Sequence, residues 1–110
     1  MNTRIITDTA YTFKVGEVGE YLEFTNVSLV TATVPGDATR STPQHYRQNW
    51  SDGGVLTFIQ GGAGALTIAA GRGVTIRTPE TLVLARQYAS ASLVYRGNDL
   101  WDLAGYMTSA

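Results

Sequence analysis

Cysteine is absent from this chain, and charged residues are scarce. Without cysteine there is no disulfide, no thiolate metal ligand, no thiol nucleophile and no redox couple. Charged residues make up 15% of the 110 positions, against roughly a quarter in an average domain. Because a free monomer usually stays soluble through surface charge, this composition favours a subunit that is covered by neighbouring proteins.

An excess of positive charge and long apolar runs are also missing. The chain has 8 Lys+Arg against 9 Asp+Glu, a net charge of -1. It therefore lacks the basic footprint of a nucleic-acid binder, and we predict no nucleic-acid partner. No run approaches the length that spans a bilayer, so we predict no membrane insertion. Residues 1–8 lack the apolar segment of a signal peptide, so classical secretion is not expected.

Strand patterns are dense and helix patterns are nearly missing. The length fits one domain over residues 1–110. Alternating apolar and polar residues, separated by Gly, Pro and Asn, predict short strands at residues 11–15, 21–25, 29–34, 55–60, 65–69, 74–77, 82–84, 91–95 and 100–103. Strands at this spacing predict an all-β, antiparallel, jelly-roll-like β-sandwich with little or no helix.

Internal repetition is slight. Thr67-Ile68 and Thr75-Ile76 lie on either side of Gly71-x-Gly73. Two copies of so short a unit are too few for a solenoid, so we interpret them as adjacent strands. Gly97-Asn98-Asp99 is expected to form a hairpin turn, because these residues tolerate the positive φ of primed turns.

The longest segment without a strand pattern is residues 35–54, and its composition is distinctive. Segments of this length are often functional. Two interpretations stay open. Tyr, Trp and Arg are typical of interface hot spots, and aromatic side chains beside Asn suit sugar faces. Alternatively, the aromatic rings tuck under the segment and fix it. The candidate interaction residues are His45, Tyr46, Arg47, Asn49 and Trp50.

Candidate catalytic groups are few. His45 is the one histidine, and its neighbouring Ser and Asp residues show no strained nucleophile turn. Asp99 and Asp102 are a carboxylate pair that could serve glycoside hydrolysis. A turn residue followed by a solvated strand residue explains the pair more simply. We therefore predict no catalytic residue and no enzymatic activity.

Two other patterns have a functional and a structural interpretation. Glu17, Glu20 and Glu23 could hold a cation, but no calcium-loop spacing is present, which favours a solvated rim. The Gly-rich segments 61–64 and 71–73 lack the Lys-Ser/Thr and the following helix of a phosphate loop, so we interpret them as hairpin turns. No metal and no cofactor are predicted. Trp101 alternates with strand neighbours and is expected to pack in the core.

The order of these motifs resembles a β-rich module found in virion proteins of tailed bacteriophages. The resemblance covers most of the chain and lies in order and spacing more than in single residues. It is carried by a strand that ends at Val34-Pro35, by residues 56–68 with Gln60 and Gly61-Gly62-Ala63-Gly64, by residues 70–76, and by residues 88–105 with Trp101.

The resemblance implies a small β-sandwich on the virion surface, in tail fibres or in decorating and adhesin-like proteins, often as a trimer. It implies no reaction and no cofactor. Members of that family usually have a short Pro-x-Gly-Thr approach to the glutamine strand, whereas this chain has the longer segment 37–54. We therefore place its own specificity in that segment, and no binding residue is transferred from the family.

The leading hypothesis is a homotrimeric capsid decoration (cement) protein that bridges and stabilises the capsid surface. The chain begins at Met1 and shows no fibrous shaft, which favours decoration over a tail fibre. The partners expected are other copies of the chain and the major capsid protein, on virions assembled in the host cytoplasm. The first alternative is a tail-fibre or tail-tip receptor-binding module, with a host surface glycan as partner. A glycan-binding or glycan-cleaving protein is a more distant alternative.

Overall fold

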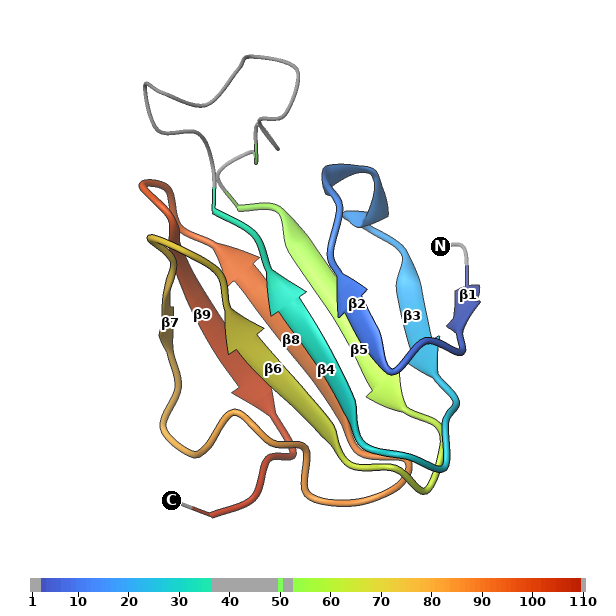
Figure 1. Cartoon of the computed structure of the whole chain (residues 1–110). Coiled ribbons are helices and arrows are strands. Elements are labelled where there is room, and N and C mark those ends of the chain that lie inside the picture. The colour runs from blue at the N-terminus through green and yellow to red at the C-terminus, as the bar shows by residue number, and fades with distance from the viewer. Residues whose placement is uncertain (1–2, 37–49, 51–52, 110) are drawn as a thin grey trace.

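The computed structural model describes residues 3–36, 50 and 53–109. They form nine strands and one short 3-10 helix (Figure 1), so the prediction of an all-β fold with little helix is confirmed. The elements are β1 (Thr3–Ile6), β2 (Ala10–Thr12), η1 (Val15–Glu17), β3 (Tyr21–Phe24), β4 (Val30–Val34), β5 (Val55–Gln60), β6 (Leu66–Ala70), β7 (Thr75–Arg77), β8 (Ser90–Tyr95) and β9 (Leu100–Gly105).

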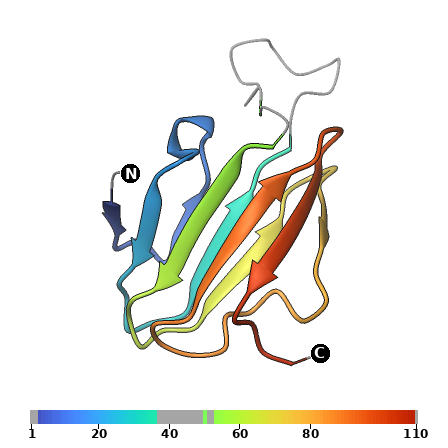
Figure 2. The ribbon, with the colours of Figure 1, turned by 180° about the vertical axis from the view of Figure 1, so that it is seen from behind.

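The strands form two sheets that face one another (Figures 1 and 2). One sheet has six strands in the order β1-β3-β5-β8-β9-β7, and the other has three in the order β2-β4-β6. Residues 82–84 cover the free edge of β6, since Val83 bridges Thr67. The side chains that alternate inward fill the space between the sheets, and the largest fully buried ones include Trp101, Phe13, Phe24, Phe58, Leu22 and Ile68.

The expected antiparallel pairing is wrong for most of the molecule. Five of the seven strand pairs are parallel, and only β5–β8 and β8–β9 are antiparallel. From β1 to β6 the chain alternates between the two sheets. It therefore winds around the core as stacked coils instead of folding back in hairpins. Alternation of apolar and polar residues is the same in both kinds of pair, because it reports only which face is buried.

Three coils stack although the sequence shows no threefold repeat. Thr3 of the first coil pairs with Tyr21 of the second, eighteen positions further on. Tyr21 pairs in turn with Thr57 of the third coil, thirty-six positions further on. The 20 residues between Val34 and Val55 lie within this second interval, and they hide the period. The interpretation of Thr67-Ile68 and Thr75-Ile76 as adjacent strands was wrong, because β6 and β7 lie in different sheets.

The glycine-rich segments are corners between the sheets and not hairpin turns. Residues 61–65 connect β5 to β6 and stack directly on residues 25–29, which connect β3 to β4. A Cβ atom on Gly62 would lie 2.3 Å from the carbonyl oxygen of Asn26, and one on Gly64 would lie 1.8 Å from that of Ser28. Glycine is required here so that one corner can approach the next.

Within the described part of the chain, the one hairpin between consecutive strands joins β8 to β9, and it was predicted correctly. Gly97, Asn98 and Asp99 all have positive φ, at 90°, 52° and 59°. Tyr95 and Trp101 pair across the turn. Among the described residues, no helix is long and apolar enough to cross a membrane.

Candidate functional site

The candidate interaction segment is represented in the structure by Trp50. His45, Tyr46, Arg47 and Asn49 lie outside the described residues, so their role stays a prediction. Trp50 is buried, at 6% exposure.

The surroundings of Trp50 match the second interpretation of the segment, in which an aromatic ring fixes it to the core. The ring packs edge-on against Trp101 with centroids 4.8 Å apart, and it lies 6.5 Å from the ring of Tyr95. Its indole N–H donates a hydrogen bond to the carbonyl oxygen of Pro35 at 3.3 Å. Trp101 itself is fully buried, which confirms its predicted place in the core.

The carboxylates of Asp99 and Asp102 have different surroundings. Asp102 accepts two hydrogen bonds from Arg77, at 2.7 and 3.0 Å, and lies 3.5 Å from a guanidinium nitrogen of Arg96. The hydrogen bonds from Arg77 lower the pKa of Asp102. A general acid in glycoside hydrolysis needs the opposite shift. Asp99 lies in the hairpin turn, where its N–H donates to the hydroxyl of Tyr95 at 3.2 Å. This geometry favours the structural interpretation of the pair.

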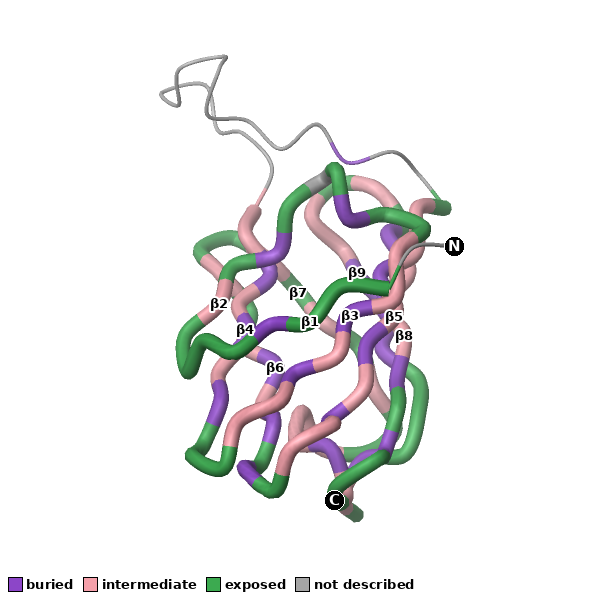
Figure 3. Tube along the Cα trace, turned by 90° about the vertical axis from the view of Figure 1, so that its right-hand side faces the viewer, coloured by how far each residue is buried: buried purple, intermediate pink, exposed green. Residues whose placement is uncertain are grey.

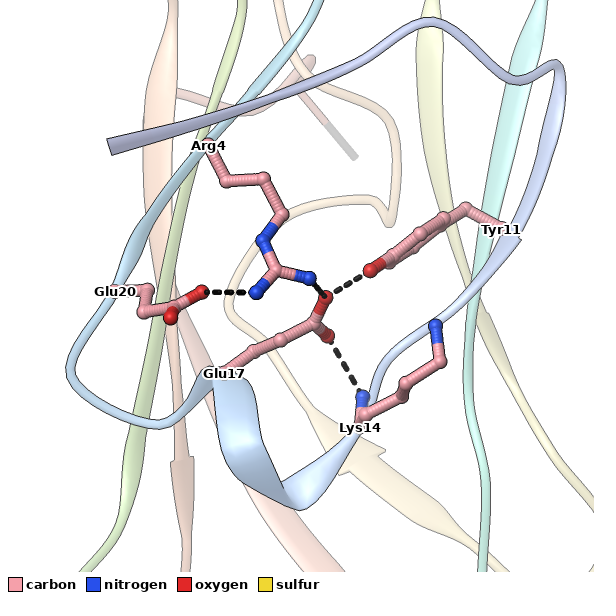
Figure 4. Close-up of polar contacts among 5 residues, drawn as sticks. All are labelled: Arg4, Tyr11, Lys14, Glu17 and Glu20. Carbon is pink, nitrogen blue, oxygen red and sulfur yellow. Dashed lines mark hydrogen bonds and ion pairs between the residues drawn. The ribbon is translucent and has the colours of Figure 1, made fainter. Parts of the chain in front are cut away.

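Glu17 occupies a position that sequence reasoning missed. It was expected on a solvated rim, but its exposure is 1%. The helix η1 turns this residue into the space between β1 and β2, which are the first strands of the two sheets (Figure 4). A glutamate between Gly16 and Gly19 is typical of an exposed turn. Its burial could have been predicted only from the strand registers that turn Arg4 and Tyr11 toward the core.

Four neighbours surround the Glu17 carboxylate (Figure 4). The backbone N–H of Lys14 donates to its Oε1 at 2.7 Å, and the hydroxyl of Tyr11 donates to its Oε2. One guanidinium nitrogen of Arg4 lies 3.7 Å from the same Oε2, and the other lies 3.3 Å from Oε1 of Glu20. We call these five residues the first-coil cluster.

The register of the two edge strands explains why the cluster forms. Arg4 pairs with Leu22, which is fully buried, so its side chain lies on the inner face of the six-stranded sheet. Tyr11 pairs with Ala32, which is equally buried, so it lies on the inner face of the other sheet. Glu17 joins the two across the open end of the core. Inward-pointing charge at an edge is a known protection against unwanted strand pairing.

Burial raises the pKa of Glu17 above its ordinary value of 4.5. The N–H of Lys14 and the charge of Arg4 act in the opposite direction, while the charge of Glu20 adds to the rise. The arrangement can store a proton and hold two strands together. It gives a dissolved substrate no access to the carboxylate, because Glu17 is covered. Among the described residues, no group of three or more His, Cys, Asp or Glu side chains could hold a metal ion.

The buried carboxylate makes stability depend on pH. The folded state binds the Glu17 proton more tightly than the unfolded chain does. The contribution of Glu17 to the free energy of unfolding is therefore fully present below pH 4.5, and it is lost as pH rises through the raised pKa. Glutamine does not titrate, so Glu17→Gln does not lose stability through deprotonation at this position. The free energy of unfolding of the wild type, measured in urea from pH 4 to 8, should therefore fall relative to that of Glu17→Gln as pH rises.

Two further variants test this assignment. Asp8→Asn removes an exposed carboxylate outside the cluster and serves as the control for the loss of one acidic side chain. Glu17→Ala should lose about 2–3 kcal/mol, because it leaves the Lys14 N–H and the Tyr11 hydroxyl without their acceptor. Parallel curves for the wild type and Glu17→Gln would contradict the raised pKa.

No protein-family model matches the chain, and no curated protein and no solved structure matches it significantly.

Proposed function

We propose that this protein is a structural component of a bacteriophage virion, a homotrimeric capsid decoration (cement) protein that bridges and stabilises the capsid surface. The proposal starts from the resemblance in motif order and from the low charge of the chain. Its partners are other copies of the chain and the major capsid protein, and its place is the virion surface.

The observation that carries the proposal is an apolar surface at one end of the sandwich, which we call the corner surface. It consists of the exposed side chains of Val27, Leu29, Tyr88 and Tyr106. β3 and β5 end there, β8 begins there and β9 ends there, so these residues lie at the same end of the strands (Figure 2). Val27 is 85% exposed and Tyr88 is 70% exposed.

This surface has a composition typical of an interface core. Aromatic residues and arginine are enriched at such places, and here the guanidinium of Arg86 lies 5.2 Å from the centre of the Tyr106 ring. Tyr88 is also held at a positive φ of 71°, and its N–H donates to the carbonyl oxygen of Gln60 at 2.6 Å. A non-glycine residue in this conformation is strained, and such strain concentrates at functional surfaces.

The mechanism that follows is one of contact area and not of bond chemistry. Each protomer of a trimer presents one corner surface to the capsid. Modest affinities then combine, because the binding of one protomer raises the effective concentration of the next. A protein that binds only the assembled shell stabilises that shell against dissociation.

The experiment that tests the proposal counts the protein on purified phage particles by quantitative mass spectrometry. We expect copies in proportion to the capsid subunits, and a lower melting temperature for shells from which the protein has been removed. A few copies per particle, located at the tail, would contradict decoration. That outcome would favour the receptor-binding alternative, in which the exposed tyrosines contact a host glycan.

Tyr88→Ser and Val27→Ser test the corner surface directly. Both side chains are exposed, so the isolated protein should keep its stability to within about 0.5 kcal/mol, while its binding to bare shells should weaken several-fold. Arg72→Ser changes an exposed residue at the opposite end of the strands and serves as the control. Unchanged binding of both corner variants would exclude this surface as the capsid contact.

A further inference from the structure

Strand β1 is the first described strand of the chain and lies at the free end of the six-stranded sheet. It is an edge strand that pairs with β3 alone, and three of its four residues are exposed (Figure 3). Ile6 is its one buried side chain, and Arg4 supplies its ion pairs. Elements with so few buried contacts open at little free-energy cost.

The connector from β1 to β2 is unusually short. It consists of residues 7–9, whereas the next two corners of the stack, residues 25–29 and 61–65, each have five residues. Facing sheets lie about 10 Å apart, and a fully extended residue spans at most about 3.5 Å. Three residues therefore make this crossing with little slack. Short connectors under strain favour the exchange of an element between copies.

The site that β1 occupies is specific for the sequence of β1. On the inner face, Glu17 and Glu20 lie within ion-pair distance of the guanidinium of Arg4. Two positions further along, Ile6 pairs with the buried Phe24. The edge of β3 therefore accepts a strand with an arginine two residues before an apolar side chain. A second copy of this chain carries that strand at the same place.

We propose that β3 of one copy accepts residues Thr3–Ile6 of a neighbouring copy, in the register that β1 has within its own chain. The copies join by exchanging their first strands, and the connector straightens instead of turning tightly. This inference rests on the self-association in the proposed function, and it names the segment and the acceptor that produce it. Each exchanged strand keeps all its contacts, so the neighbour is recognised without a new set of side chains.

Disulfide trapping tests the exchange cleanly, because the chain has no cysteine of its own. Ile5 and Glu23 are register partners on the outer face of the sheet. One protein carries Ile5→Cys and a second, of different mass, carries Glu23→Cys. The two are refolded together at micromolar concentration and oxidised. We expect a covalent pair of one Ile5→Cys chain and one Glu23→Cys chain, several-fold more abundant than either homodimer.

The control is a pair that exchange of β1 leaves within one chain. Ser92 and Ala104 are register partners in the β8–β9 hairpin. Ser92→Cys and Ala104→Cys should cross-link efficiently when they are in the same chain and only at background level when they are in separate chains. If the Ile5 and Glu23 variants behave in the same way, the exchange is excluded.

Light scattering of the wild-type protein separates this inference from the proposed function. A trimer without the Ile5–Glu23 cross-link between chains overturns the exchange and leaves the trimer intact. A dimer with the cross-link supports the exchange and overturns the trimer. A monomer without the cross-link overturns both.

Discussion

Replacing Gly64 by alanine is expected to lower the free energy of unfolding by about 3 kcal/mol or more. The added Cβ atom would lie 1.8 Å from the carbonyl oxygen of Ser28 and 2.5 Å from its carbonyl carbon. These are backbone atoms, so no side-chain rotation relieves the contact. The corners are also tied together, since the N–H of Gly64 donates to the carbonyl oxygen of Asn26 at 2.8 Å.

The loss should therefore spread beyond the site. To admit the methyl group, the corner at residues 61–65 must separate from the corner at residues 25–29, and this shifts the pairing of β4 with β6. A small domain has about 5–15 kcal/mol of stability in total, so the variant should unfold at clearly lower urea concentration and temperature. Urea titration followed by tryptophan fluorescence measures the effect.

Gly16→Ala is the matched control. A Cβ atom on Gly16 would meet nothing within 4 Å, and this glycine has no positive φ. Alanine there should leave stability unchanged or raise it by up to about 1 kcal/mol, because it reduces the freedom of the unfolded chain. Equal losses for the two variants would show that the corners do not depend on close stacking.

The stacked corners also mark the limit of what the sequence reveals about this fold. The strands at residues 21–25, 55–60 and 100–103 were predicted close to their observed bounds, because burial of alternate side chains leaves a visible period. Strand direction leaves no such period. Glycine-rich connectors suit hairpins and corners equally, so the parallel winding could not be distinguished from antiparallel pairing. β1 was missed because a short edge strand buries only Ile6.

The first-coil cluster was hidden for a related reason. Its members come from four places in the chain, and only the register of two different sheets brings Arg4 and Tyr11 to the same carboxylate. The position of Tyr11 on the apolar face of a predicted strand was visible in the sequence. The burial of Glu17 was not, because acidic residues next to glycine are usually solvated.

Truncation of Trp50 to alanine is expected to cost about 3–5 kcal/mol, the usual range for a buried aromatic residue. The ring fills space against Trp101 and Tyr95, so alanine would leave a cavity beside these two rings. Trp50→Phe should lose only about 1 kcal/mol, since it keeps an aromatic ring and gives up one hydrogen bond to Pro35.

Near-ultraviolet circular dichroism gives this prediction a second measurement. The chain has two tryptophans, and their edge-on rings lie 4.8 Å apart, so they should produce a coupled signal. Trp50→Phe should abolish that signal while the protein stays folded, and Trp101→Phe should do the same. An unchanged spectrum together with unchanged stability of Trp50→Ala would contradict the burial of Trp50.

The burial of Trp50 determines how the segment at residues 37–49 has to be tested. Loss of particle binding in Trp50→Ala would follow from unfolding alone, so that variant cannot identify a contact residue. The informative substitutions are His45→Ala, Tyr46→Ala, Arg47→Ala and Asn49→Ala, each with its unfolding curve measured beside its binding. A variant that keeps its Tm and loses binding would assign the contact to the segment. Full binding by all four would leave the corner surface as the partner contact.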